Sequence, residues 1–346
     1  MRIYLLLTAF SFALWSCGGA SDTARAPGET SNAYETVPDA IERLDPALDQ
    51  VVSPTAQLEI LAEGYDWSEG PLWVARANML LFSDIPPNSI YKWTPDGGAE
   101  LYLRPSGYTG DTPRGGEPGS NGLLLDGQGR LVLCQHGDRR LARMDAPLED
   151  PAPQFVTLVD SYQGKRLNSP NDAVFDAMGN LYFTDPPYGL EGGPDSPLKE
   201  LDFQGVYRLS TDGALTLITD TLSRPNGIGL SPDGSRLYVA NSDPAYPVWT
   251  VFDINRDGQV SNGRLFVDAS ERAKTDRGVP DGLKVDGRGN LFATGPGGVW
   301  VISPEGKHLG TIRTGQATSN VALDEQGRTL YITADMYLMR MRLGAE

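Results

Sequence analysis

Five residues with oxygen-bearing side chains recur at one place in a repeated sequence pattern. They are Asn121, Asn171, Asn226, Asp281 and Asn320. Each precedes a hydrophobic stretch, a polar turn with glycine and a second hydrophobic stretch, and Glu69 holds the same place in an earlier copy. If the copies surround one axis, these side chains converge. Carboxylate and amide oxygens are the ligands that hard divalent cations prefer.

The predicted metal ligands are Glu69, Asn171, Asn226 and Asp281. Two carboxylates and two amide oxygens form an all-oxygen set, which favours Ca²⁺ and leaves Zn²⁺, Mn²⁺ and Mg²⁺ open. The chain has only two histidines, so a histidine-rich metal site is excluded. It also has no G-x-S-x-G motif, so a serine nucleophile with a histidine base has little support. Metal-assisted hydrolysis is the leading class of chemistry.

The elements that must position these ligands are β-hairpins. The copies lie about 50 residues apart, a period typical of propellers, and counting the copy at Glu69 gives six blades. The stretch from Ala56, AQLEILAEG, is expected to pair with YLMRMRL near the C-terminus and close the ring. The sequence therefore predicts an all-β fold, a six-bladed β-propeller with a central metal site, over residues 56–346.

Further polar residues are expected around the mouth of the predicted site. Asn121 is placed near the metal through water or substrate, and Asn168 and Tyr188 could bind sugar hydroxyls. His136 is either a substrate contact or acid, or a structural histidine. Asn320 lacks the glycine that follows most copies and is expected to be structural. An Asn or Asp before a turn can also simply cap its own backbone.

The Gly/Pro-rich segment 105–119 is long for a connection between blades. It either covers the site or forms a flexible surface loop. The Trp-Asp pair of one common propeller repeat is absent, which weakens a purely scaffolding function.

The N-terminus carries a targeting signal. Residues 1–17 combine Arg2, an apolar run and Leu-Trp-Ser-Cys, which resembles a bacterial lipobox with Cys17 as the lipidated residue. Residues 18–55 are rich in Ala, Ser, Thr, Pro and acidic residues and are expected to form a mostly disordered tether. The expected location is the bacterial envelope, as a lipoprotein facing the periplasm, with ordinary secretion as the alternative. The second cysteine, Cys134, is expected to be a buried strand residue.

The formal net charge of −16 is spread over the turns. This charge argues against nucleic acid and anionic lipid as partners. The expected partner is a small molecule, and contact with a membrane is expected only through the N-terminal lipid.

Several motifs together resemble the senescence marker protein/gluconolactonase family, and they follow its order from about Ala56 to the C-terminus. They are SEGPLW, EPGSNGLLLD, CQHGDRR, KRLNSPNDAVFDAMGNLYFTDPPYGL, ELDFQGVYRL, RPNGIGLSPD and VPDGLKVD. The resemblance implies a six-bladed propeller with a divalent metal in its central tunnel and hydrolysis of sugar lactones. It implies Glu69, Asn171, Asn226 and Asp281 as metal ligands. It also implies that Asp281 accepts the proton of the attacking water.

Three functions remain open from the sequence. The first is a gluconolactonase-like enzyme that opens a sugar lactone to the aldonic acid. The second is a phosphotriesterase-like hydrolase that uses the same site, because related diisopropylfluorophosphatases act on organophosphates. The third is a non-catalytic sugar-binding propeller. Intact Glu69 and Asp281 favour either enzyme over the binding protein.

Overall fold

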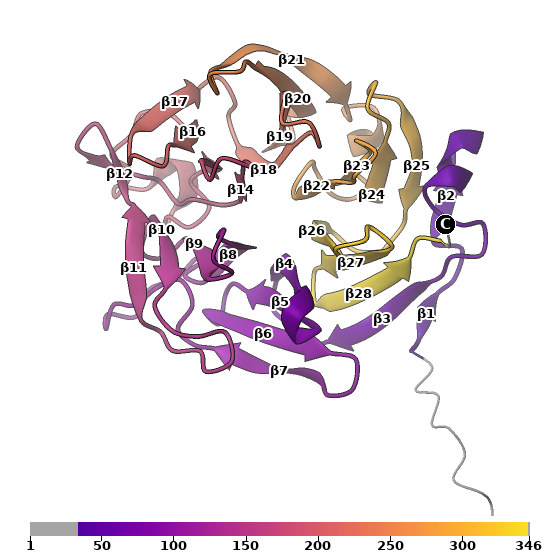
Figure 1. Cartoon of the computed structure of the whole chain (residues 1–346), viewed down its shortest axis with the longest axis horizontal. Helices are drawn as coiled ribbons and strands as arrows, with labels where there is room; N and C mark the ends of the chain where they lie inside the picture. Colours follow the sequence, from indigo (N-terminus) through magenta and orange to yellow (C-terminus); the bar gives the residue numbers. More distant parts are fainter. Residues whose placement is uncertain (1–33, 345–346) are drawn as a thin grey trace, which may run out of the picture. The chain divides into compact units, whose positions relative to one another are not determined.

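The computed structural model describes residues 34–344, and six antiparallel sheets in this part surround a central axis (Figure 1). The predicted all-β, six-bladed propeller is confirmed. The first blade runs outward from the axis as β4 (Ser68–Val74), β5 (Met79–Asp84), β6 (Ser89–Thr94) and β7 (Gly98–Leu103). The second contains β8 (Ser120–Leu125), β9 (Leu131–Gln135), β10 (Arg140–Met144) and β11 (Phe155–Val159).

The third and fourth blades follow the same outward order. The third contains β14 (Ala173–Phe175), β15 (Leu181–Asp185), β16 (Gly205–Leu209) and β17 (Leu215–Thr219). The fourth contains β18 (Pro225–Leu230), β19 (Arg236–Asp243), β20 (Tyr246–Ile254) and β21 (Val260–Asp268). Between the second and third blades lies a small hairpin of β12 (Ser161–Tyr162) and β13 (Lys165–Arg166).

The last two blades take strands from the N-terminal part of the chain. The fifth contains β22 (Leu283–Val285), β23 (Leu291–Gly295), β24 (Gly298–Ile302), β25 (His308–Ile312) and, outermost, β2 (Ile41–Arg43). The sixth contains β26 (Thr318–Leu323), β27 (Thr329–Ala334), β28 (Tyr337–Arg342), β3 (Leu58–Glu63) and β1 (Thr36–Val37). Short 3₁₀ turns are η1 (Pro46–Gln50), η2 (Ala75–Ala77), η3 (Gly193–Asp195) and η4 (Arg272–Lys274).

Strand β3 closes the ring. It pairs antiparallel with β28, with Leu58 opposite Met341, as the sequence predicted for the segment from Ala56. The innermost strands β4, β8, β14, β18, β22 and β26 contact one another in that order, and β26 contacts β4. Closure therefore joins the ends of the propeller by backbone hydrogen bonds and leaves no open gap between the first and last blades.

The predicted tether differs from the structure over residues 34–55. This stretch contributes β1, β2 and η1 to the outer surface of the last two blades instead of remaining irregular. Arg272 and Arg313 both form ion pairs with Glu42 of β2. Leu48 of η1 is buried in the cluster between these blades. Residues 1–33, with the predicted signal and Cys17, lie outside the described part.

The repeated turns between the two inner strands share one hydrogen-bond pattern. In the second, third and fifth blades an aspartate carboxylate accepts two backbone amides of its own turn, at 2.8–2.9 Å. These residues are Asp126, Asp176 and Asp286. A glycine with positive φ then completes each turn, which a side chain would strain.

The core consists of six hydrophobic clusters, and each joins two neighbouring blades. Leu81 and Leu133, for example, pack between the first and second blades. Cys134 is fully buried between the second and third, as predicted. Within residues 34–344, no helix is long and apolar enough to cross a membrane.

Candidate active site

The predicted ligands and their equivalents lie where the inner strands depart from regular pairing. The register shifts between Glu69 and Leu72 in β4, between Ser120 and Leu123 in β8, and between Pro225 and Ile228 in β18. Asn171 and Asp281 lie two residues before the regular strands β14 and β22. A bulge redirects a side chain away from the alternating pattern. The irregularity is therefore the local feature that turns these side chains toward the axis.

A glycine after the site residue lets neighbouring inner strands approach closely. Gly227 donates its amide to the Asp281 carbonyl at 3.2 Å, and a Cβ on Gly227 would lie 2.2 Å from that oxygen. Gly122 donates to the Asn171 carbonyl at 2.8 Å. These bonds tie successive blades together beside the site. They explain why the repeat reads Asn-Gly or Asp-Gly at this point.

The side chains of the repeated Asn and Asp residues, together with Glu69, are called here the oxygen ring. Four side-chain oxygens of the oxygen ring are buried and lack a hydrogen-bond partner among residues 34–344. They are Oδ1 of Asn121, Asn171, Asn226 and Asp281. Leaving a buried acceptor unpaired is costly, typically about 1–3 kcal/mol each. Four such atoms at equivalent repeat positions indicate a ligand that accepts lone pairs, such as a cation.

Glu69 completes the ring and is held by two donors. The amide of Gly70 donates to Oε2 at 2.7 Å, and the Asn320 side chain donates to the same oxygen at 3.2 Å. Asn320, which the sequence analysis set aside as structural, thus orients the Glu69 carboxylate. The Glu69 side chain is almost completely buried.

The carboxylates of the ring lack compensating positive charge from the protein. Burial is the main cause that raises the pKa of Glu69 to about 8; the charges of Asp172 and Glu117 act in the same direction, and its hydrogen bonds act against them. Burial likewise raises the pKa of Asp281 well above its usual value, and the charge of Glu69 adds to this effect. A bound cation would reverse both shifts by stabilising the charged forms.

The donor set fits a hard divalent cation. It contains Glu69, Asp281 and amide oxygens of Asn171 and Asn226, and the unpaired Oδ1 atoms are the buried groups that a cation would satisfy. No group of three or more His, Cys, Asp or Glu residues in the described chain could hold a metal. Amide oxygens are therefore needed to complete a ligand set, which disfavours a soft metal.

Two acidic residues near the oxygen ring, Asp172 and Glu117, were not predicted from the sequence as site residues. Asp172 follows Asn171 where most other copies have glycine, and its Oδ2 lies 3.5 Å from the Lys284 ammonium. Its charge contributes to the raised pKa of both Glu69 and Asp281. The aspartate in place of glycine was a signal in the sequence. Glu117 gave none, because it lies in the aperiodic segment 105–119.

Of the other predicted site residues, Tyr188 and His136 lie near acidic residues of the site, whereas Asn168 holds a loop. Tyr188 lies close enough for the charge of Asp281 to act on its hydroxyl, and burial is the main cause of its raised pKa. His136 is fully buried, with Nδ1 3.2 Å from Glu117 Oε2. Asn168 instead donates its amide to the carbonyls of Asp185 and Phe203, at 3.1 and 2.9 Å. These bonds hold the loop before Asn171. The side-chain Oδ1 of Asn168 has no hydrogen-bond partner within the described residues, whereas its Nδ2 makes both bonds.

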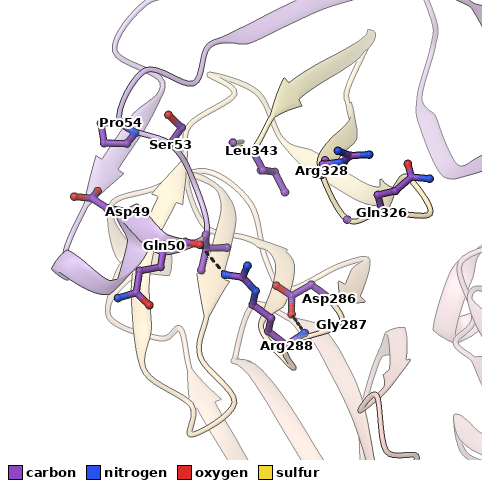
Figure 2. Close-up of a pocket in the computed structure, with 13 residues that line it drawn as sticks. Asp49, Gln50, Ser53, Pro54, Asp286, Gly287, Arg288, Gln326, Arg328 and Leu343 are labelled. Carbon is purple, nitrogen blue, oxygen red and sulfur yellow. Dashed lines mark hydrogen bonds between the residues drawn. The ribbon is translucent and has the colours of Figure 1, made fainter. Parts of the chain in front are cut away.

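A separate pocket of about 490 Å³ lies near the N-terminal segment (Figure 2). Asp49, Asp286, Arg288 and Arg328 are among its lining residues, and Arg288 donates to the Gln50 carbonyl at 3.0 Å. No residue of the oxygen ring lines it. This pocket is therefore distinct from the candidate active site.

Comparisons with known proteins agree with the fold. Residues 67–335 match the family model described as SMP-30/Gluconolactonase/LRE-like region. A gluconolactonase from Zymomonas mobilis is 41% identical over 330 residues, covering 93% of this chain and 91% of the relative. An L-arabinolactonase from Azospirillum brasilense is 36% identical over 82% of this chain and 86% of its own length.

A solved gluconolactonase structure from Xanthomonas campestris superposes with a TM-score of 0.76 at 34% identity. It covers 91% of this chain and 99% of that chain. The matched region contains every residue of the oxygen ring. The chain belongs to the SMP-30/gluconolactonase/LRE-like family.

Proposed function

We propose that this protein is a hydrolase that opens a sugar lactone to its aldonic acid. The observation that carries the proposal is the ring of buried, unpartnered oxygens at equivalent blade positions, beside the Glu69 and Asp281 carboxylates. Relatives that cover most of the chain are named gluconolactonase and L-arabinolactonase. Their names support a lactone of an aldonic acid as the substrate class.

The residues that would hold a divalent cation are Glu69, Asn171, Asn226 and Asp281, and Ca²⁺ suits their oxygens best. When bound, the cation would polarise the lactone carbonyl and make water more acidic. Zn²⁺, Mn²⁺ and Mg²⁺ are the alternatives to compare with Ca²⁺.

The chain's own residues account for the proton transfer and orientation. Asp281 is proposed to accept a proton from the attacking water, since its Oδ1 has no hydrogen-bond partner among residues 34–344. Asn121, also with an unpaired Oδ1, would orient the water or a substrate hydroxyl. Tyr188 and His136 would contact the sugar, whereas Asn168 would act mainly by fixing the loop that precedes Asn171.

A panel of substrates tests the function. Wild-type protein, stripped of metal and reconstituted with Ca²⁺, Zn²⁺, Mn²⁺ or Mg²⁺, is assayed with gluconolactone, pentonolactones and an organophosphate. We expect lactone opening above the spontaneous rate only with metal. The organophosphate is included because a squid diisopropyl-fluorophosphatase is 27% identical over about half of this chain. Preference for the organophosphate would support the second activity, and binding without turnover would support a sugar-binding propeller.

The location is also a proposal. Residues 1–17 are proposed to direct the chain to the bacterial envelope, where lipid on Cys17 would anchor it facing the periplasm. Secretion without lipid is the alternative.

A further inference from the structure

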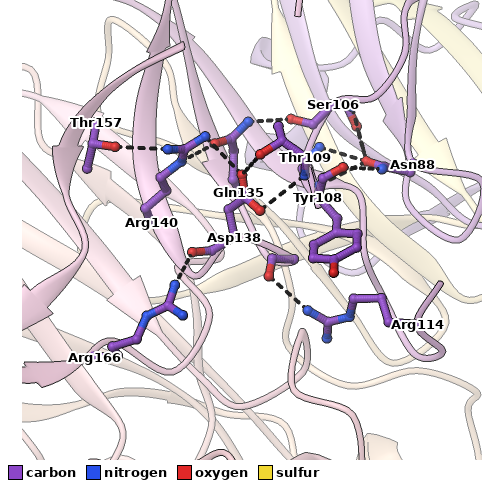
Figure 3. A network of polar contacts seen from close by, with 12 residues as sticks. Asn88, Ser106, Tyr108, Thr109, Arg114, Gln135, Asp138, Arg140, Thr157 and Arg166 are labelled. Atoms are coloured by element: carbon purple, nitrogen blue, oxygen red, sulfur yellow. Dashed lines mark hydrogen bonds and ion pairs between the residues drawn. The ribbon is translucent and has the colours of Figure 1, made fainter. Parts of the chain in front are cut away.

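The segment 105–119, called here the strap, is fixed to the loops of its neighbouring blades (Figure 3). Asn88 Oδ1 accepts the backbone amides of residues 106–108, at 2.7–3.2 Å. The Asp138 carboxylate accepts from the amide and hydroxyl of Thr109, at 3.1 and 2.6 Å. Arg114 donates to the carbonyls of Gly137 and Gly189. The strap is therefore held in place at residues 106–109 and at Arg114, which contradicts a loose surface loop.

This attachment brings Glu117 to the active site. Its Oε2 lies 3.2 Å from Nδ1 of His136, and the Glu117 side chain remains 37% exposed. The Glu117 charge is also among the causes that raise the pKa of Glu69, Asp281 and Tyr188, after burial in each case. One carboxylate thus acts on three groups of the site and contacts a fourth.

His136 is the fourth group, and its ring is incompletely satisfied. The side chain is fully buried, yet neither ring nitrogen has a hydrogen bond of good geometry to any residue of the described chain. Gly189 packs against it, and a Cβ there would lie 2.5 Å from the His136 Cβ. The residue before Gly189 is Tyr188, on which the charges of Asp281 and Glu117 act. His136 therefore lies beside Glu117 and the Tyr188–Gly189 segment, with hydrogen-bonding capacity left for water or substrate.

Lactone opening requires a second proton transfer, to the ring oxygen of the lactone as it leaves the carbonyl carbon. The ring carbon–oxygen bond breaks with its electron pair on the ring oxygen, and an alkoxide is a poor leaving group unless it is protonated. A proton donor near this oxygen would accelerate the step. A glutamate beside Nδ1 accepts the Nδ1–H of a histidine and stabilises the imidazolium form, whose second proton, on Nε2, can then be transferred.

We propose that Glu117 is a positioning residue that holds His136, and that His136 Nε2–H gives its proton to the ring oxygen as the lactone opens. This inference rests on the lactonase function proposed above. Water gives one proton to Asp281, and its oxygen bonds to the carbonyl carbon. The ring carbon–oxygen bond breaks, and the ring oxygen takes the His136 proton to become a hydroxyl. The proton on Asp281 returns to His136 through solvent. Water and lactone are thereby converted to the hydroxy acid, and the protein ends in its starting protonation state.

Glu117→Gln is the main test, because it keeps the shape and removes the charge from a partly exposed side chain. We expect kcat on gluconolactone to fall about tenfold with KM nearly unchanged, and His136→Gln to lower kcat about 10²-fold. The double variant should be no slower than His136→Gln, since Glu117 acts through the histidine. Asp111→Asn, an exposed strap residue, is the matched control and should behave as wild type. Rates are compared at saturating Ca²⁺, and calorimetric titration gives the Ca²⁺ affinity of each variant, because the Glu117 charge also acts on Glu69 and Asp281.

Three results would overturn the inference. A raised KM with unchanged kcat in Glu117→Gln would mean that the pair only binds sugar hydroxyls. Additive losses in the double variant would show that the two residues act independently. Behaviour equal to Asp111→Asn would leave Glu117 without a role. If the wild-type protein opens no lactone with any metal, the lactonase function fails first, and the two failures are thereby distinguished.

Discussion

The Asn320 side chain donates to the Glu69 carboxylate at 3.2 Å, and this bond joins the sixth blade to the first beside the oxygen ring. The same asparagine accepts the amide of Val321 at 2.9 Å through its Oδ1. Both ends of its amide are therefore used, and the Nδ2 end fixes the orientation of a predicted metal ligand. A side chain of the sixth blade thus helps to orient a predicted ligand in the first blade.

Asn320→Ala should weaken metal binding without changing the ligand set. Loss of one hydrogen bond to a carboxylate corresponds to about 1 kcal/mol, or roughly a fivefold weaker affinity. Glu69→Gln removes a ligand charge and should weaken binding more than Asn320→Ala. Calorimetric titration of the metal-free proteins with Ca²⁺ measures both effects. Equal affinities for wild type and Glu69→Gln, with Ca²⁺ or with the other three cations, would remove Glu69 from the ligand set.

Gly227→Ala should destabilise the propeller and disturb the site together. A Cβ on Gly227 would lie 2.2 Å from the Asp281 carbonyl, so β18 and the chain before β22 would have to separate. Overpacking of this kind typically costs about 1–3 kcal/mol. Urea unfolding of the metal-free protein gives the stability, and Ca²⁺ titration gives the effect on the site.

Gly127→Ala is the matched control for this substitution. It also adds one Cβ to a glycine of the repeat, but nothing lies within 4 Å of the added atom. The control should change the free energy of unfolding little. Equal stabilities for the two variants would show that the inner strands tolerate the separation.

Much of the site could be predicted from sequence because the ring residues repeat with the blades. Glu69, Asn171, Asn226 and Asp281 each precede the same hairpin, and periodicity alone placed them around one axis. The strands β1 and β2 were missed, since two or three residues carry no period and pair with whichever outer edge is open.

Glu117 was missed for a different physical reason. Its position depends on hydrogen bonds that the strap donates to Asn88 and Asp138, which are distant in sequence and carry no repeat signal. The function of Asn168 was also obscured, because an asparagine before a turn serves equally to bind a ligand or to hold a loop. Its two acceptors, the carbonyls of Asp185 and Phe203, are distant in sequence and come close to Asn168 only when the third blade folds.

The stability of the protein should fall as pH decreases from about 6.5 to about 4, in part through His308. Burial lowers the pKa of His308 to about 4, and its ring stacks on Trp300 with centroids 3.8 Å apart. The unfolded chain binds a proton below about 6.5, whereas the folded protein does so only near 4. Protons therefore favour unfolding across this window, and stability rises with pH through it.

His308→Gln removes this titration and should make the free energy of unfolding depend less on pH between about 6.5 and 4. Urea unfolding at pH 7, 6, 5 and 4.5 measures the free energy of unfolding for wild type and variant. The gap between the two should narrow as pH falls, because only the wild type loses stability through the histidine. Parallel curves would show that His308 does not carry the effect.

Cys17→Ser should release the protein from the membrane fraction of a bacterial host. Acyl chains on the cysteine would supply about 0.8 kcal/mol per buried CH₂, and serine cannot accept the same thioether lipid. Fractionation followed by mass spectrometry of the mature N-terminus gives the result. A wild-type N-terminus elsewhere, on protein found in the soluble fraction, would replace the anchored form by a secreted one.

Asp281→Asn should abolish most turnover while keeping an oxygen at the same place. The carboxylate is proposed to accept the proton of water, and loss of a general base typically lowers kcat by about 10²–10⁴-fold. The variant is compared with wild type at saturating Ca²⁺, so that weaker metal binding does not limit the rate. Asn121→Ala, which removes an unpaired oxygen but no charge, should lose less. Asp281→Asn at saturating Ca²⁺ could instead open gluconolactone at nearly the wild-type rate while His136→Gln is inactive. The general base would then be another residue at the mouth of the site, and His136 is the first residue to test for that role.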